Sequence, residues 1–275
     1  YYRSLFTIPF IGVTGSVGKT STKEMLASVL KEKFKVHKTQ GNFNNELGVP
    51  LTLFAMEEDT EVAIIEMGIS DFGEMTRLSK IVKPNICVIT NIGCCHLENL
   101  GDRAGVLKAK TEMFKNMQKD GKIFLCGDDD KLSTVKEFKG IVPTFYGLND
   151  TNKYYGEIIE NNSEKGIKCN LHFDGKSIPV TVPAIGNHMV ANAMASVAIG
   201  KYLGMTDEEI VRGIESYSTI GGRNNVIKTD KYTVIDDCYN ANPTSTKASI
   251  NTIANFSNPR KVCILGDMME LGKDE

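Results

Sequence analysis

The sequence lacks the features of a membrane protein and of a nucleic-acid-binding protein. No apolar run reaches the roughly 18 residues that a transmembrane helix needs, and no signal peptide is visible. The formal net charge is −2, so no basic field would attract nucleic acid or a membrane surface. We therefore expect a cytoplasmic protein that neither binds nucleic acid nor inserts into a membrane.

The seven cysteines also lack a disulfide or metal-binding pattern. None forms a C-x-x-C pair, and several stand in apolar runs, such as Cys87 in NICVIT and Cys263 in KVCILG. This favours buried free thiols in a reducing compartment. Cys94 and Cys95 beside His96 could suggest zinc, but zinc requires about four ligands and no partner cluster is visible.

Internal repeats, low-complexity tracts and an initiator methionine are missing as well. The 275 residues allow one large domain or a domain plus a fragment. The chain begins with Tyr1 and stops in Gly-Lys-Asp-Glu, so we expect it to be a portion of a longer polypeptide.

What the sequence does contain is an alternation of apolar runs with amphipathic stretches. It predicts an α/β fold with a doubly wound, mostly parallel sheet, whose strands are apolar throughout because helices cover both faces. The predicted strands are Pro9–Thr14, Val62–Glu66, Ile86–Thr90, Ile123–Cys126 and Tyr232–Asp236. The predicted helices are Lys19–Phe34, Glu74–Ile81, Ala104–Met117, Val190–Leu203, Asp207–Ser216 and Thr246–Ala254.

Two segments differ from this alternation. Residues 154–183 contain short alternating runs separated by Asn, Gly and Asp turns, which predict a small antiparallel insertion or flanking sheet. After Asn255, a linker with a proline leads into KVCILG and a glycine turn, which we interpret as the first strand of a second α/β domain. The expected domains are therefore residues 1–258 and the beginning of another at 259–275.

The strongest chemical signal is IGVTGSVGKTS, at residues 11–21, between an apolar strand and a helix. Glycines let backbone N–H groups close around phosphate oxygens, while Lys19 would reach the β- and γ-phosphates and Thr20 would bind Mg²⁺. Val13 stands where the strict phosphate-loop pattern has its first glycine, so an ordinary glycine turn is the alternative. The predicted nucleotide-binding loop comprises Gly15, Ser16, Val17, Gly18, Lys19, Thr20 and Ser21.

Polar residues follow several predicted strands, at the edge of the sheet where ligands bind in doubly wound folds. Glu66 ends one strand, Ile86–Thr90 runs on to His96, and Tyr232–Asp236 leads to Asp237. A carboxylate near a triphosphate is the usual Mg²⁺ ligand, although Glu66 could be a solvated strand end. His96 could equally be a loop histidine that bonds to the backbone.

Lys110 falls inside an apolar helical stripe that includes Val106, Met113 and Phe114. An inward lysine is unfavourable unless it is paired or modified, so we predict a functional role. The alternative is a buried stem with the ammonium reaching water.

Seven motifs occur in an order that resembles the central domain of the Mur ligases. They are GVTGSVGKTS, QGNFNNELGVPLTL, EMG, NIGCCHLE, KAKTEMF, DDCYNANP and LGDMMELG. The resemblance covers nearly the whole chain and implies an ATP-dependent ligase of peptidoglycan synthesis. NFNNELGVP, DDCYNANP and LGDMMELG favour the branch that joins D-alanyl-D-alanine to a UDP-N-acetylmuramoyl-tripeptide through an acyl phosphate. The resemblance also implies a monomer whose partners are small-molecule substrates.

The resemblance implies roles for particular residues. Lys19 would contact the phosphates of ATP, and Thr20 and Glu66 would hold one Mg²⁺. His96 and Lys110 would hold a second, and in several family members the lysine at this position is carbamylated. The predicted catalytic residues are Lys19, Asn45, His96 and Lys110.

Further residues would contact the substrates. Asn44 and Asn45 would line the substrate and phosphoryl region. Asn192, Arg223 and Asp237 would contact the adenine, phosphate and ribose of ATP, although Asn192 could simply be a polar residue near a helix start.

The sequence departs from the family pattern in two places. Met189 follows His188 where the family often has asparagine, which leaves the role of His188 open, and Gly221 replaces the proline usual before Gly-Arg. We expect the family's N-terminal UDP-binding domain to be absent from these 275 residues and its C-terminal Rossmann-like domain to be truncated after its opening strand. We therefore expect weak nucleotide binding and little ligation from these 275 residues alone.

Two alternatives stay open. The first is another ligase of the superfamily, with a different amino acid acceptor or with folylpolyglutamate synthetase activity. The second is a nucleotide-binding module or phosphate-loop NTPase without ligation, against which stand Glu66, His96 and Lys110, more metal ligands than a simple switch requires.

Overall fold

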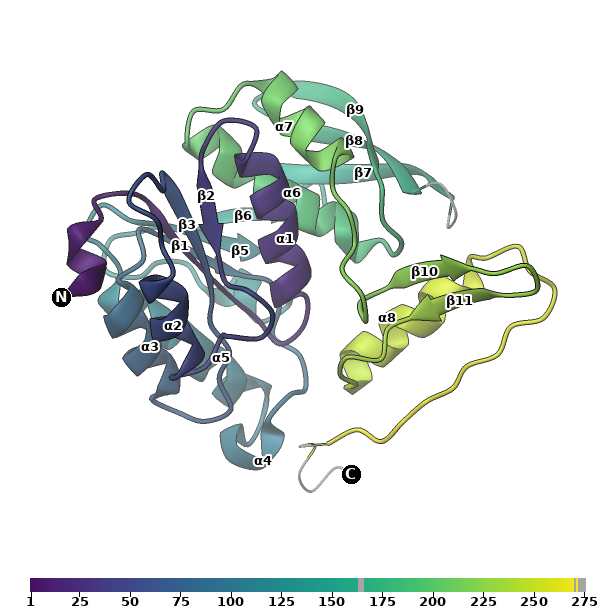
Figure 1. The fold of residues 1–275 in the computed structure, drawn as a ribbon, viewed down its shortest axis with the longest axis horizontal. Helices are drawn as coiled ribbons and strands as arrows, with labels where there is room; N and C mark the ends of the chain where they lie inside the picture. The colour runs from purple at the N-terminus through teal and green to yellow at the C-terminus, as the bar shows by residue number, and fades with distance from the viewer. Residues whose placement is uncertain (163–165, 270, 272–275) are drawn as a thin grey trace.

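The computed structural model describes residues 1–162, 166–269 and 271. Its body is a nine-stranded sheet of order β2-β3-β1-β4-β5-β6-β7-β8-β9 (Figure 1). Pairing is parallel from β2 to β7 and antiparallel from β7 to β9. The strands are β1 (Phe10–Thr14), β2 (Val36–Lys38), β3 (Val62–Glu66), β4 (Ile86–Ile89), β5 (Lys122–Cys126), β6 (Thr144–Gly147), β7 (Tyr154–Asn162), β8 (Gly166–Phe173) and β9 (Lys176–Val182). The predicted fold class is therefore confirmed.

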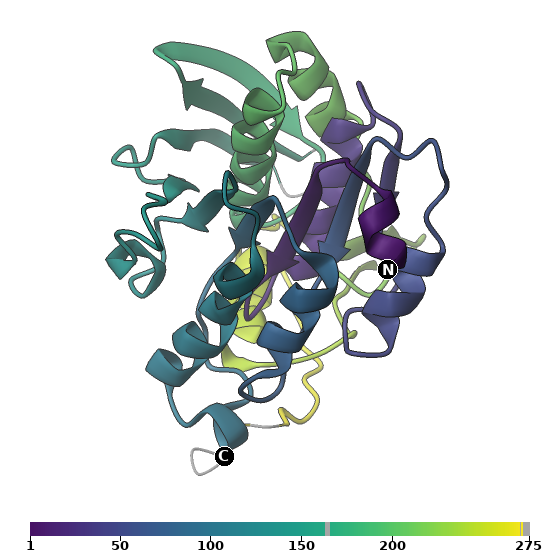
Figure 2. The ribbon, with the colours of Figure 1, turned by 90° about the vertical axis from the view of Figure 1, so that its left-hand side faces the viewer.

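Helices cover the sheet in two groups. The helices α1 (Lys19–Leu30), α6 (His188–Tyr202) and α7 (Asp207–Glu215) contact one another, while α3 (Glu74–Val82) contacts α2 (Gly48–Phe54) and α5 (Arg103–Thr111) in the other group (Figures 1 and 2). Shorter helices are η1 (Tyr2–Leu5), α4 (Leu97–Leu100), η2 (Glu112–Asn116) and η3 (Leu132–Thr134). No helix of the described residues is long and apolar enough to cross a membrane.

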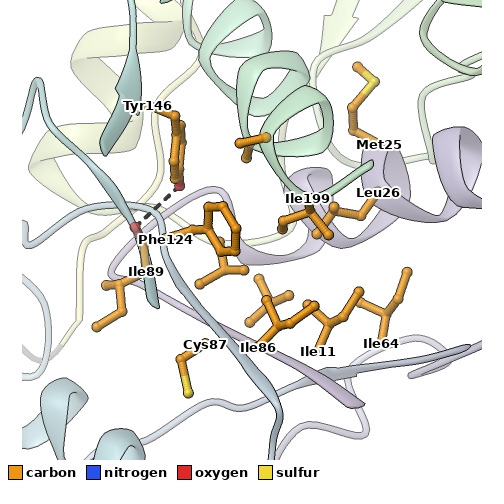
Figure 3. Close-up of a cluster of buried hydrophobic side chains, with 14 of the residues drawn as sticks. Ile11, Met25, Leu26, Ile64, Ile86, Cys87, Ile89, Phe124, Tyr146 and Ile199 are labelled. Carbon is orange, nitrogen blue, oxygen red and sulfur yellow. Dashed lines mark hydrogen bonds between the residues drawn. The ribbon is translucent and has the colours of Figure 1, made fainter. Parts of the chain in front are cut away.

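The core lies between the sheet and these helices. Alternate strand residues point to opposite faces: Ile86 lies on the side of α1 and α6, whereas Cys87 points away from it (Figure 3). The residues of the central strands β1, β3 and β4 are fully buried because both faces are covered, as their apolar sequences indicate. Tyr146 joins β6 to β4 by donating its hydroxyl to the Ile89 carbonyl at 3.2 Å.

The predicted flanking strands exist and extend the main sheet. The parallel pair β6–β7 connects the antiparallel part to the rest, so residues 154–183 form a flanking sheet and not a separate insertion. The strands β2 and β6 and the helix α2 were not predicted. Each is short, and a short segment carries too little periodicity to identify.

A second, smaller unit follows α7. It consists of β10 (Asn225–Lys228), β11 (Thr233–Asp236) and α8 (Pro243–Ala254). The predicted strand Tyr232–Asp236 forms, but it pairs antiparallel with β10 outside the main sheet, which corrects our expectation that it shares an edge with the other strands. Val234 is 45% exposed, so this strand has an open face, unlike the buried strands of the body.

Two other predictions need correction. The helix predicted over Ala104–Met117 is divided into α5 and η2, at the point where the Thr111 hydroxyl donates to the Leu107 carbonyl. The strand predicted in KVCILG does not form in the described part of the chain, where Ile264 is 96% exposed. A strand requires a neighbour for its backbone hydrogen bonds, and none lies beside this segment in the described residues.

Candidate functional site

The loop between β1 and α1 has the geometry of an anion-binding turn. Gly18 has a φ of 80°, which glycine adopts without strain, and α1 begins at the next residue with no side chain capping its first turn. The amide groups of that turn have no acceptor within the helix, so they are available to an anion. At Gly15, a Cβ atom would lie 1.9 Å from the Thr90 hydroxyl, so only glycine fits there.

Residues that follow β4 hold the loop in place. The amide of Ser16 donates to the Asn91 carbonyl at 3.0 Å, and the amide of Val17 donates to the Asn91 side chain at 3.0 Å. The Thr90 hydroxyl donates to the Val17 carbonyl at 2.6 Å. The shape of the loop is thus fixed by a neighbouring strand before any ligand binds.

Lys19 folds back over this loop. Its ammonium donates to the Gly15 carbonyl at 2.9 Å and to the Ser16 carbonyl at 3.3 Å. Burial lowers the pKa of Lys19, the nearby Glu66 carboxylate opposes that effect, and Arg223 adds to it. The ammonium therefore lies where phosphate oxygens would meet the loop.

Glu66 ends β3 with its side chain only 1% exposed. Its Oε1 accepts hydrogen bonds from the Thr20 hydroxyl at 3.2 Å and the Asn44 amide at 2.9 Å. Its Oε2 accepts no hydrogen bond from the described residues, although Lys23 Nζ lies 3.5 Å away. Thr20 and Glu66 thus place a hydroxyl and a carboxylate side by side, which is an oxygen donor set suited to Mg²⁺.

The structure also locates His96, Lys110 and Asn45. His96 lies at the start of α4 with a φ of 53° and lines the cavity described below. Lys110 is 1% exposed on α5, so its side chain is buried. Burial, then repulsion by Lys19, lowers the pKa of Lys110 to about 8. The Asn45 side chain accepts from the Leu47 amide at 3.1 Å and from the Gly48 amide at 2.8 Å, at the turn that leads into α2.

The opposite wall comes from α6 and the second unit. The Arg223 guanidinium lies over the Tyr239 ring, 4.1 Å from its centroid. Asp237 Oδ1 accepts from the Asn224 amide at 3.1 Å. Asn192 Oδ1 accepts from the Thr22 hydroxyl at 2.9 Å, so its side chain is already tied to α1.

One cavity of about 950 Å³ collects most of the predicted site. Its lining includes Ser16, Val17, Gly18, Lys19, Thr20, Ser21, Asn44, Asn45, Glu66, His96, Asn192, Arg223 and Asp237. Gly15 and Lys110 are not part of the lining. His188 also lines it, and burial lowers the pKa of His188 while Asp237 raises it.

Some lining residues were not singled out from the sequence. They include Asn91, Asp128, Tyr239, Asn242 and Thr244. Asn91 and Tyr239 belong to the quoted motifs, whereas Asp128 follows β5 and could have been found as a polar residue at a strand end. Within the described residues, no group of three or more His, Cys, Asp or Glu side chains could hold a metal ion. The predicted metal and catalytic roles therefore stay predictions.

Lys23 was also missed. It lies one helical turn after Lys19 and is 1% exposed, between Glu24 and Glu66. A spacing of four residues from a phosphate-loop lysine, on the same helix face, was the available signal.

A parallel sheet with a glycine loop leading into α1 is the architecture of a phosphate-loop α/β protein. The family model of the Mur ligase middle domain matches residues 13–200, and that of the Mur ligase glutamate ligase domain matches residues 222–275. The chain belongs to the Mur ligase family. The second match begins well before residue 259, where the sequence predicted the boundary, and that boundary stays a prediction.

Individual relatives agree with this assignment. The UDP-N-acetylmuramoyl-tripeptide–D-alanyl-D-alanine ligase of Bacillus subtilis is 42% identical over 95% of this chain, and the chain spans 56% of that protein. The Escherichia coli protein of the same name is 31% identical over 96% of the chain and 59% of its own length. The chain thus spans little more than half the length of these relatives.

Solved structures support the fold. A crystal structure of MurF from Acinetobacter baumannii has a TM-score of 0.94 and 36% identity, covering 100% of this chain and 60% of that one. The MurF ligase of Thermotoga maritima, solved in complex with ADP, has a TM-score of 0.89 and 29% identity, covering 99% of this chain and 64% of that one.

Proposed function

We propose that this chain is the ATP-binding part of a ligase that joins UDP-N-acetylmuramoyl-tripeptide to D-alanyl-D-alanine in peptidoglycan precursor synthesis. The observation that carries the proposal is the meeting of Lys19, Thr20 and Glu66 in one cavity, which suits a triphosphate with a divalent cation. The names of the relatives at 31–42% identity supply the substrates.

We place this chain within a longer ligase, because its relatives extend well beyond the matched region. In this proposal a preceding domain grips the UDP-sugar, and the remainder of the C-terminal domain closes over ATP. The match of the second family model at residue 222 favours a domain boundary near that residue, before β10.

The proposed reaction has two steps. A carboxylate oxygen of the tripeptide attacks the γ-phosphorus of ATP, the bond to ADP breaks, and an acyl phosphate forms. The amine of D-alanyl-D-alanine then attacks the acyl carbon, loses a proton, and expels phosphate. Activation is needed because a carboxylate does not react with an amine until its oxygen can leave.

The protein's part in this chemistry is positioning and charge neutralisation. The loop amides and Lys19 would hold the phosphates of ATP, with Arg223 approaching from the opposite wall. Asn44 lies beside Glu66 and would orient the phosphoryl acceptor. Asn192 and Asp237 would contact the adenine and ribose, and Asn45 the substrate, as lining residues of the same cavity.

The residues present fit one Mg²⁺. Thr20 and Glu66 provide adjacent oxygens, and Glu66 Oε2 is buried without a hydrogen bond from the described residues. When bound, Mg²⁺ supplies neutralisation of the phosphate charge. Lys110 does not fit a second cation as an ammonium, because that group has no lone pair and repels positive charge. Carbamylation would give it a carboxylate-like group, which is why we propose the modification for a second site that includes His96.

The test is phosphate release by the full-length protein, with and without the UDP-muramyl tripeptide and D-alanyl-D-alanine. We expect turnover only with both, and amide product by mass spectrometry. ATP hydrolysis that is indifferent to both substrates would contradict the proposal and favour a simple NTPase. A panel of amine acceptors in the same assay distinguishes this ligase from others of the superfamily.

A further inference from the structure

A second fully buried lysine lies behind the proposed metal site. Lys23 is on α1, four residues after Lys19, and its side chain is 1% exposed. Its ammonium donates to the Thr39 carbonyl at 2.7 Å and lies 3.2 Å from Glu24 Oε1 and 3.5 Å from Glu66 Oε2. A buried charge is costly unless a partner compensates it, so the choice of partner matters.

Glu66 depends on Lys23 more than Glu24 does. Glu24 has a second ion pair, with Lys38, and its side chain is 14% exposed. Glu66 is 1% exposed, and Lys23 is its sole ion-pair partner in the described part of the chain. Its other contacts, from Thr20 and Asn44, are neutral donors.

Thr39 links the two residues from behind. Its hydroxyl accepts from the Glu66 amide at 3.0 Å, while its carbonyl accepts from Lys23. The carboxylate of Glu66 is therefore held on one side by Lys23 and on the cavity side by Thr20 and Asn44. This arrangement orients Glu66 without a metal.

The charges of this cluster are balanced. Lys23 and Lys38 contribute two positive charges, and Glu24 and Glu66 contribute two negative charges. A divalent cation at Glu66 would leave the cluster with two excess positive charges. Without Lys23 the excess would be one, so Lys23 opposes the binding of a free cation. The phosphates of a nucleotide would supply the missing negative charge.

We propose that Lys23 is a positioning residue that holds the Glu66 carboxylate when no metal is bound and makes cation binding at Glu66 depend on the nucleotide. The inference rests on the proposed function, since it takes Glu66 to be the Mg²⁺ ligand. It goes further by assigning a task to a lysine that reaches neither the phosphates nor the substrate.

The test is the binding of Mn²⁺, a stand-in for Mg²⁺, followed by electron paramagnetic resonance without nucleotide. Lys23→Gln removes the charge and keeps a donor for the Thr39 carbonyl. We expect this variant to bind Mn²⁺ at least about tenfold more tightly than the wild type, because it loses a like charge beside the metal ligand. An unchanged affinity would overturn the inference.

Glu24→Gln is the matched control, because it removes the other carboxylate beside Lys23 and leaves Glu66 intact. We expect it to bind Mn²⁺ no more tightly than the wild type. If Lys23 only stabilised the fold, both variants would melt earlier and neither would gain Mn²⁺ affinity. Should Lys23→Gln fail to fold, the double variant Lys23→Gln/Glu24→Gln restores the charge balance, and it must bind Mn²⁺ more tightly than Glu24→Gln alone.

A parallel series with ATP separates this inference from the proposed function. If the wild-type protein binds no Mn²⁺ even with ATP, the proposed metal–nucleotide site is wrong. If it binds Mn²⁺ with ATP, and equally tightly without it, only the role of Lys23 is wrong. When ATP is the only other ligand added, we expect the wild type to bind Mn²⁺ measurably.

Discussion

The two walls of the cavity are built differently. The body wall, made of the loop, Glu66 and their neighbours, is anchored between buried strands, and Thr20 is only 3% exposed. The wall from the second unit buries little: Thr252 is the sole buried residue of α8, and neither β10 nor β11 has a buried residue. Its fixing contacts, Arg223 on Tyr239 and Asp237 to Asn224, are internal to that unit.

This difference separates two tasks. A wall that is rigid before ligands bind suits the metal–phosphate chemistry, because positioned charges stabilise a transition state without reorganisation. A wall with few buried contacts opens at a lower free energy, which suits the entry and exit of a nucleotide. Substitutions on the body wall should therefore affect turnover, and those on the second wall should affect affinity.

The largest effect should come from Lys19→Met on the body wall. Loss of the ammonium over the loop removes a charge aimed at the phosphates, so we expect phosphate release by the full-length protein to fall about 10²-fold to 10³-fold. The assay is the substrate-dependent one described above. Lys31→Met, an exposed position just beyond α1, is the control and should keep its activity. A rate within about threefold of wild type would refute the role of the loop lysine.

An intermediate effect is expected from Lys110, behind the same wall. Burial lowers its pKa from 10.5 to about 8, which corresponds to about 3 kcal/mol of lost stability below pH 8. Between pH 8 and 10.5 this lysine binds more protons in the unfolded chain than in the folded one, so its own contribution to the free energy of unfolding should rise with pH. The buried thiols of Cys87, Cys126 and Cys169 contribute in the opposite direction, because burial raises their pKa. Urea unfolding of the wild type and of Lys110→Met at pH 7 and 10 isolates the lysine's contribution as the difference between the two proteins.

Lys108→Met is the matched control for that experiment, because Lys108 is exposed on the same helix and should leave the pH dependence intact. CO₂-free buffer is required, since a carbamate would replace the ammonium and remove the rise. An equal pH dependence of the wild type and of Lys110→Met in CO₂-free buffer would show that Lys110 is not a buried ammonium.

The sequence predicted the body wall better than the second wall, for a physical reason. Strands such as Val62–Glu66 are buried on both faces, so continuous apolar letters located them, and their polar ends located Glu66. Lys110 was found because it interrupts an apolar stripe. By contrast, the antiparallel pairing of β11 depends on a partner strand that has little apolar character.

Lys23 shows the other limit of sequence patterns. Its charge is balanced by Glu24, its neighbour in sequence, and by Glu66, which is remote in sequence. A buried ion pair of the second kind arises from tertiary contact, so local periodicity does not reveal it. The hydrogen bonds from the Leu47 and Gly48 amides to the Asn45 side chain were missed for a different reason: α2 itself was not predicted.

The smallest effect should come from Tyr239→Leu on the second wall. The variant loses the aromatic face under Arg223 and should weaken ATP binding about threefold to tenfold, as expected for one partly exposed cation–π contact. Since Tyr239 is 52% exposed, the melting temperature should stay near that of the wild type. Calorimetric ATP titration measures the affinity, with Tyr232→Leu, 71% exposed, as the control. A loss of ATP affinity as large as the fall in phosphate release expected for Lys19→Met would abolish the contrast between the two walls. The second wall would then carry the phosphate chemistry itself.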